Sequence, residues 1–250
     1  MKKLALLSIA LLFLGAFASA ANTNPCQGGA GSAGTFNKAC VFYGGDLDLN
    51  DPNQNGLANE QDAVVNGNPY GAATFQNFKW GGGTIGGLFT NNLSTLNPAS
   101  GYWEIRSGVS EGNGGTLVMS GTATGGNFLQ TATGRSDFGY TEYTDAVMFD
   151  PKTLDAGTYW FAVVPVDPNN AGRSFNSNAN TLLNGIGTQT SGQQFFNSAF
   201  FGANYTNANN EGVFNTFSSG VLQGVPEPSS LIMLGSGLVA AAGVVRRRLL

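Results

Sequence analysis

The chain has 250 residues, of which eleven are basic and fifteen acidic, and it contains no histidine. Without an imidazole, the chain cannot form a Ser-His-Asp or Cys-His catalytic site or a histidine metal ligand. Its 37 glycines, together with many Asn, Thr, Ser and aromatic residues, favour turns and short strands over helices.

The first twenty residues have the pattern of a secretory signal peptide. Two lysines precede an apolar segment from Leu4 to Phe17, and small residues occupy Ala18 and Ala20. We expect signal peptidase to cut after Ala20, so that the mature chain lies outside the cytoplasm. A second membrane helix is the alternative, which the short apolar segment and the cleavage site disfavour.

The region between the signal peptide and Pro226 is acidic, with six basic residues against fourteen acidic ones. This balance argues against nucleic acid or an anionic membrane surface as a partner. With a little over 200 residues, the region is long enough for one domain with a full hydrophobic core.

The chain has two cysteines, Cys26 and Cys40. In an oxidising compartment two cysteines at this spacing most simply form one disulfide, worth about 3 kcal/mol in the chain-entropy model. A catalytic or metal-binding thiol pair is the alternative. The spacing matches no metal motif, and no histidine could complete one.

A polar segment follows from Asp46 to Asp62, and within it the oxygen-bearing side chains have the spacing of a calcium loop. The predicted ligands are Asp51, Asn53, Asn55, Asn59 and Asp62, with Gly56 at the sixth position. The twelfth position is Asp rather than the usual Glu, and no convincing amphipathic helix precedes the loop. The alternative is a polar surface loop of Asp and Asn turns, without a cofactor.

From residue 73 onward, short segments rich in β-branched and aromatic residues alternate with Gly, Asn and Pro turns. Their number and spacing predict an all-β fold, an antiparallel β-sandwich or jelly roll. The expected strands are Thr74 to Trp80, Thr84 to Thr90, Gly101 to Ser107, Thr116 to Gly121, Phe138 to Phe149, Gly157 to Pro165 and Gln193 to Phe201.

Two of these strands have informative patterns. Trp103 and Ile105 should share the buried face of their strand, because side chains alternate between faces. The segment from Gly157 to Pro165 is apolar on both faces and is expected to be a central strand.

Carboxylates and aromatic residues offer two kinds of site. Paired carboxylates hydrolyse glycosides in many proteins, and the available set is Glu104, Glu142, Asp145 and Asp150. None has a local context that separates it from a surface carboxylate, so we expect no enzymatic activity.

Aromatic rings on a sandwich face could instead stack on sugars, although aromatic residues at strand spacing are more often core. The candidates are Trp80, Tyr102, Tyr140 and Tyr143.

The Asn-rich and Gly-rich segment from Phe175 to Phe217 contains regularly spaced aromatic residues. These predict that the segment packs back onto the sandwich. Residues 218–224 are expected to be a linker.

The tail begins with the collar Pro226, Glu227 and Pro228, where the prolines disfavour a helix. An uncharged apolar segment follows, and residues 229–245 reach the length of a short transmembrane helix. Arg246, Arg247 and Arg248 then place the C-terminus in the cytoplasm.

A collar, an apolar helix and an arginine cluster in this order resemble the PEP-CTERM sorting tail of Gram-negative bacteria. The resemblance implies that exosortase, a membrane peptidase, recognises the collar and cuts near it, often in bacteria that make exopolysaccharide. An ordinary tail anchor is the alternative.

A second resemblance concerns the segment from Trp103 to Ser107, the glycine-rich turn behind it, and the segment from Ala156 to Phe161. Their order is similar to that in β-sandwich ectodomains of exosortase substrates. This implies the fold and no particular activity.

These features predict a signal peptide (1–20), an N-terminal segment (21–72) packed on the β-sandwich (73–217), a linker (218–224) and a sorting tail (225–250). The protein would be held in the bacterial inner membrane with a periplasmic ectodomain, and would reach the cell surface or the matrix after sorting. A structural or adhesive role is expected. The alternatives are exopolysaccharide binding and carboxylate-dependent glycoside hydrolysis.

Overall fold

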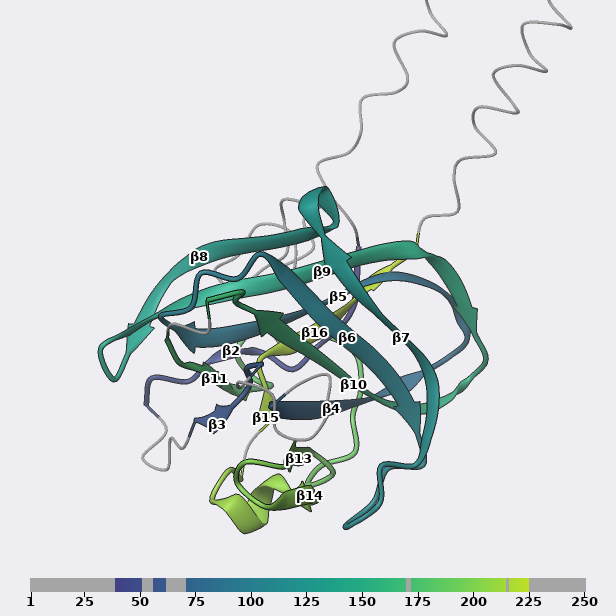
Figure 1. Cartoon of the computed structure of the whole chain (residues 1–250). Helices are drawn as coiled ribbons and strands as arrows, with labels where there is room; N and C mark the ends of the chain where they lie inside the picture. Colours follow the sequence, from purple (N-terminus) through teal and green to yellow (C-terminus); the bar gives the residue numbers. More distant parts are fainter. Residues whose placement is uncertain (1–38, 51–55, 62–70, 170–171, 215, 225–250) are drawn as a thin grey trace, which may run out of the picture.

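A computed structural model describes residues 39–50, 56–61, 71–169, 172–214 and 216–224, and these residues form mostly β-strands. Two antiparallel sheets face each other, and the strands of one cross those of the other obliquely (Figure 1). The predicted all-β antiparallel sandwich is therefore confirmed.

The first sheet has seven strands and is built around β5. β9 pairs along one edge of β5, and β16 and β11 pair along different parts of the other edge. β8, β1 and β3 then extend the sheet outward. Its strands are β1 (Cys40–Tyr43), β3 (Leu57–Ala58), β5 (Gly83–Ser94), β8 (Phe128–Asp137), β9 (Tyr140–Leu154), β11 (Ser174–Asn176) and β16 (Ser219–Gln223).

The second sheet has six strands in the order β14-β13-β4-β10-β6-β7. β10 lies between β4 and β6, so the predicted central strand is confirmed. The strands are β4 (Ala72–Trp80), β6 (Ser100–Ser107), β7 (Thr116–Thr124), β10 (Gly157–Val166), β13 (Phe195–Ser198) and β14 (Ala203–Asn207).

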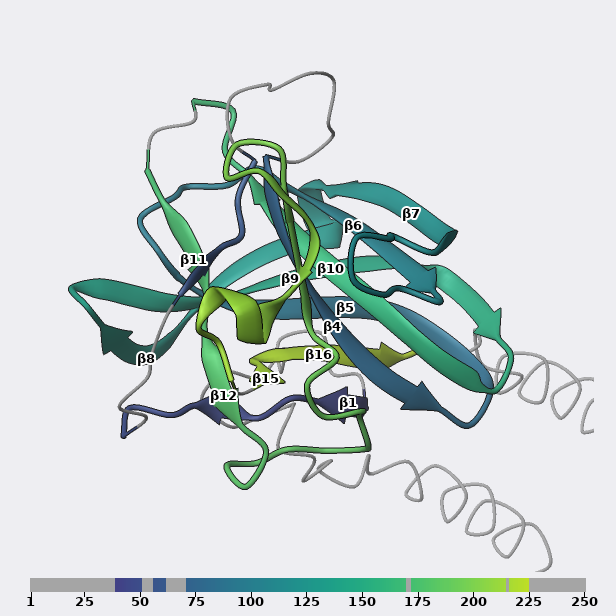
Figure 2. The ribbon, with the colours of Figure 1, turned by 90° about the horizontal axis from the view of Figure 1, so that it is seen from below.

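A small third sheet has the order β15-β12-β2 and lies at one side of the sandwich (Figure 2). It consists of β2 (Asp46–Leu47), β12 (Asn178–Asn180) and β15 (Thr216–Phe217). Two short 3-10 helices, η2 (Gly125–Asn127) and η3 (Ala208–Glu211), complete the described elements. Because β2 and β12 are 130 residues apart but paired, the N-terminal segment packs against the Asn-rich region.

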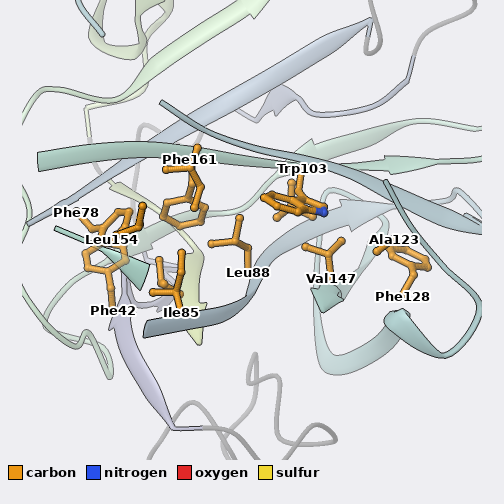
Figure 3. Close-up of a cluster of buried hydrophobic side chains, with 13 residues drawn as sticks. Phe42, Phe78, Ile85, Leu88, Trp103, Ala123, Phe128, Val147, Leu154 and Phe161 are labelled. Carbon is orange, nitrogen blue, oxygen red and sulfur yellow. The ribbon is translucent and has the colours of Figure 1, made fainter. Parts of the chain in front are cut away.

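The main hydrophobic core fills the space between the two large sheets (Figure 3). Trp103 and Ile105 from β6 point into it, as the alternation along the strand predicted. The Trp103 ring stacks on that of Phe149 from the opposite sheet, with 4.1 Å between the ring centroids. Such stacking adds to the free energy gained by burying two large apolar rings.

All seven expected strands overlap described strands, namely β4, β5, β6, β7, β9, β10 and β13. The Asn-rich region also packs back as expected, because β11 to β15 pair with other strands and Phe195 and Phe217 are buried. The structure departs from the sequence-based expectations in two places. β8 was not predicted, and residues 218–224 are not a linker, since β16 pairs with β1 and β5 inside the first sheet.

The predicted signal peptide and the predicted transmembrane helix at 229–245 lie outside the described residues. Within the described part of the chain, no helix has the length and apolar character needed to cross a membrane.

Candidate functional site

The four candidate catalytic carboxylates are distributed over both large sheets. Glu104 lies on β6, whereas Glu142 and Asp145 lie on β9 of the opposite sheet. Glu142 and Asp145 are three positions apart on the same strand, so the two side chains point to opposite faces of their sheet. Asp150 is exposed. Glycosidases need two carboxyl groups on either side of one sugar bond, and this distribution does not place Glu142 and Asp145 in that way.

Glu104 and Glu142 each form an ion pair with an arginine. Arg106 Nε lies 2.9 Å from Glu104 Oε1, and the Tyr102 hydroxyl donates a 3.0 Å hydrogen bond to Glu104 Oε2. Burial and the neighbouring Glu104 raise the pKa of Tyr102 to about 12. Arg135 pairs with Glu142, which is fully buried. Both glutamates therefore contribute to internal polar networks.

The network around Glu142 joins the N-terminal segment to the first sheet. Arg135 Nη1 lies 2.8 Å from Asp46 Oδ1 on β2, and the Tyr43 hydroxyl donates a 2.6 Å hydrogen bond to the same oxygen. Asn91 Nδ2 in turn donates to the Tyr43 hydroxyl. Burial, together with Asp46, raises the pKa of Tyr43 well above its usual value. Tyr43 is therefore neutral and holds Asp46 in place.

Asp145 is fully buried and faces the space between the large sheets. Its two oxygens accept hydrogen bonds from Asn92 Nδ2 at 2.7 Å and Gln130 Nε2 at 3.0 Å. Burial raises the pKa of this carboxyl to about 7, although both amides act in the opposite direction. Asn59 connects the cluster to the second sheet, because its Nδ2 donates to Asn92 Oδ1 and to the carbonyl oxygen of Val163.

Asn59 was predicted as a calcium ligand, but its side chain is engaged in the interior. Besides the two bonds that its Nδ2 donates, its Oδ1 accepts one from the backbone N–H of Thr74. The other four predicted ligands lie outside the described residues, so the calcium loop stays a prediction. Within the described ranges, no three acidic or cysteine side chains are close enough to hold a metal ion.

The four predicted sugar-stacking rings are half-buried and held by neighbours. Trp80 Nε1 donates to the carbonyl oxygen of Leu154, and the Tyr140 ring packs edge-on against Phe175. Tyr102 bonds Glu104, and Tyr143 is only partly exposed. The most exposed aromatic rings among the described residues are others, and three of them belong to the segment from Phe175 to Phe217 whose aromatic residues were expected to pack onto the sandwich. They are Phe138 (66% exposed), Phe214 (64%), Phe200 (58%) and Phe201 (51%).

One of these rings, Phe214, lines a pocket of about 130 Å³ between the third sheet and the segment before β13. The other walls come from residues 179–181, from Gln189, Ser191, Gly192 and Gln194, and from Thr216. Amide and hydroxyl groups dominate this lining, and no charged residue contributes to it. No local sequence pattern indicates this pocket, because its glutamines lie in a long region of similar composition.

The remaining predicted residues are placed only in part. Cys40 lies in β1 and is buried, whereas Cys26 lies outside the described residues, so their disulfide stays a prediction. The collar, the arginine cluster and the cleavage-site alanines also lie outside the described residues. β16 ends at Gln223, three positions before the collar begins.

Comparison with protein families identifies this tail. Residues 224–248 match the family model of the PEP-CTERM protein-sorting motif. The chain carries a PEP-CTERM sorting motif. It is therefore an exported protein that an exosortase sorts through its C-terminal signal. The match contains the collar and all three arginines, and it begins directly after β16, the last strand of the sandwich. No curated protein and no solved structure matches the chain.

Proposed function

We propose that this PEP-CTERM protein acts at the cell surface or in the extracellular matrix as a structural or adhesive component, without catalysis. Exosortase would process it at the collar after export, and the Cys26–Cys40 disulfide would form in the periplasm. The arrangement of the carboxylates supports a role without turnover, because Glu104 and Glu142 are committed to arginines inside the protein.

The observation that carries a structural role is the edge of the second sheet. β7 pairs with β6 and with no other described strand, and most of its residues are exposed. It contains no charged residue and no proline, which are two of the features that protect edge strands. A bulge interrupts its pairing near Val118, but the register from Met119 to Thr124 is regular. Six uncharged residues thus offer backbone groups to another strand.

The natural occupant of this edge is the β7 of a second copy, paired antiparallel. Such pairing would place Ser and Thr side chains opposite one another and would bring no like charges together. It would also join two six-stranded sheets into one continuous sheet, as β-augmentation does in other complexes. Repeated contacts of this kind would suit a component of a surface layer.

A charge on the edge tests this role. Thr122 is exposed on β7, so Thr122→Lys would place two ammonium groups near each other in a β7–β7 pair. Thr141→Lys is the matched control, because Thr141 is exposed on β9 but its backbone pairs with strands on both sides. Association of the full chain in detergent would be followed by sedimentation velocity over a range of protein concentrations.

We expect Thr122→Lys to weaken self-association by about tenfold or more, equal to about 1.4 kcal/mol. Thr141→Lys should associate like the unmodified chain. A chain that stays monomeric at all concentrations, or equal association of both variants, would refute a structural role through β7.

A further inference from the structure

We propose that the pocket beside Phe214 binds a neutral sugar unit of a glycan. This inference deepens the proposed adhesive role by naming a ligand class, but it concerns a different part of the molecule from the β7 edge. Residues of β12 and β15 line the pocket. These two strands pair side by side (Figure 2). Its volume is several times the roughly 30 Å³ that a water molecule occupies, which leaves space for a sugar ring.

The hydrogen-bond network below the pocket fixes the orientation of its amides. The backbone N–H of Phe217 donates a 2.9 Å hydrogen bond to Gln76 Oε1, so this atom must be the oxygen. Gln76 Nε2 therefore faces Gln189 and donates to its Oε1. The hydroxyl of Thr216 lies 2.8 Å from the same Gln189 oxygen. A backbone donor thus determines which end of the Gln189 amide is turned away from the interior.

The end of the Gln189 amide that is turned away from the interior is Nε2, a hydrogen-bond donor. Gln189 Nε2 makes no hydrogen bond with the described residues, and Gln189 lines the pocket. Beside it, Gln194 is only 2% exposed, and its Nε2 lies 3.4 Å from Gln189 Oε1. Gln194 Oε1 has no donor among the described residues. The pocket therefore holds an available amide donor next to an available amide acceptor.

A sugar hydroxyl matches this pair because it donates one hydrogen bond and accepts others. The exposed ring of Phe214 provides an apolar surface on the same pocket, suited to the C–H face of a sugar ring. Neither Gln189 Nε2 nor Gln194 Oε1 is among the buried polar atoms that lack a partner, so water reaches both atoms, and a sugar hydroxyl would take the place of that water. The arrangement of one aromatic ring and a few oriented polar groups is typical of ligand sites.

The electrostatics select a neutral ligand. None of the lining residues is charged, so nothing in the pocket can pair with a carboxylate, sulfate or ammonium group. The exported region is also acidic overall, with fourteen acidic and six basic residues before the collar. An anionic polysaccharide would be repelled at long range and would gain no ion pair at the site.

The test compares variants of the full chain, in detergent, on immobilised polysaccharides. The neutral probes are dextran, laminarin and galactomannan, and alginate is the anionic comparison. Phe214→Ala removes the apolar wall, and Ser191→Phe fills the pocket from an exposed position on its lining. The matched control is Phe138→Ala, since Phe138 is equally exposed but does not line the pocket. Thermal melts of each variant establish that the fold is retained.

We expect at least one neutral polysaccharide to be retained and alginate not to be. Phe214→Ala and Ser191→Phe should each weaken that binding by about tenfold or more, whereas Phe138→Ala should leave it unchanged. No retention on any neutral probe, equal binding by Phe214→Ala, or preference for alginate would overturn the inference. Self-association through β7 is measured separately, so either proposal can fail while the other stands.

Discussion

Asp145→Asn should make the stability of the protein less sensitive to pH. The substitution keeps the size of the side chain and removes its charge. Asn92 can still donate to the new amide oxygen, and Gln130 can accept from the new amide nitrogen once its own amide turns over. The pKa of the native carboxyl is about 7 instead of the ordinary 3.8, chiefly because burial penalises its charged form. One pH unit of difference corresponds to about 1.4 kcal/mol. Charging Asp145 in the folded protein therefore costs about 4 kcal/mol more than in the unfolded chain.

The sign of the effect follows from proton binding. Below pH 3.8 the Asp145 carboxyl is mostly protonated in both the folded and the unfolded chain, so it does not lower the free energy of unfolding. As the pH rises toward 7, the unfolded chain loses this proton while the folded protein keeps it, so stability falls. Above pH 7 the folded protein bears the full cost. The variant has no such cost, so its advantage over the unmodified chain should grow by about 4 kcal/mol between pH 3.5 and pH 8.

Urea unfolding of the full chain, followed by the fluorescence of its three tryptophans, measures this difference at each pH. Asp150→Asn is the matched control, because Asp150 is exposed on the same strand and its substitution should change stability by less than about 0.5 kcal/mol. A difference between Asp145→Asn and the unmodified chain that stays constant with pH would refute the reasoning. It would mean that Asp145 ionises in the folded protein as it does in the unfolded chain.

Two further predictions concern the Arg135 network and the tail. Arg135→Met leaves Glu142 buried without its cation, so we expect the free energy of unfolding to fall by about 3–5 kcal/mol. Urea denaturation at pH 7 measures this change. An unchanged urea midpoint would show that the ion pair contributes little to stability. Mass spectrometry of the intact protein from its host should find a C-terminus near the collar and a mass 2 Da below that of the dithiol form. Detection of residues 229–250 in the mature protein would contradict processing, and a mass that reduction does not change would contradict the Cys26–Cys40 disulfide.

The strands that were predictable from sequence are those whose own residues carry the signal. β6 and β10 combine β-branched and aromatic residues with clear turns on either side, so each is recognisable as a strand even though β10 pairs with strands far from it in sequence. β8 was missed because it lies at an edge and is exposed along much of its length. Neither face of β8 is fully buried, so its sequence need not alternate between apolar and polar residues. The strand consists largely of Thr, Ala, Gly, Arg and Ser and lacks the alternation by which strands are recognised.

β16 was missed for a different reason. Residues 218–224 were expected to be a linker, but Gly220 is required by packing: a Cβ at this position would lie 2.3 Å from the ring of Phe89. The partners of β16 are β1 and β5, which are more than a hundred residues away in the chain. No local pattern can indicate such pairing, nor can it indicate which arginine a buried glutamate will meet.

The position of β16 changes what sorting requires of exosortase. A linker at 218–224 would have kept the folded domain away from the collar, but Gln223 is paired in the first sheet and Pro226 is three positions later. Three residues extend at most about 11 Å. A cut at the collar, as proposed above, would therefore fall within about 11 Å of a residue that is paired in the first sheet. Exosortase then has to accommodate a folded β-sandwich beside its active site, or β16 has to leave the centre of the sheet before the chain is cut.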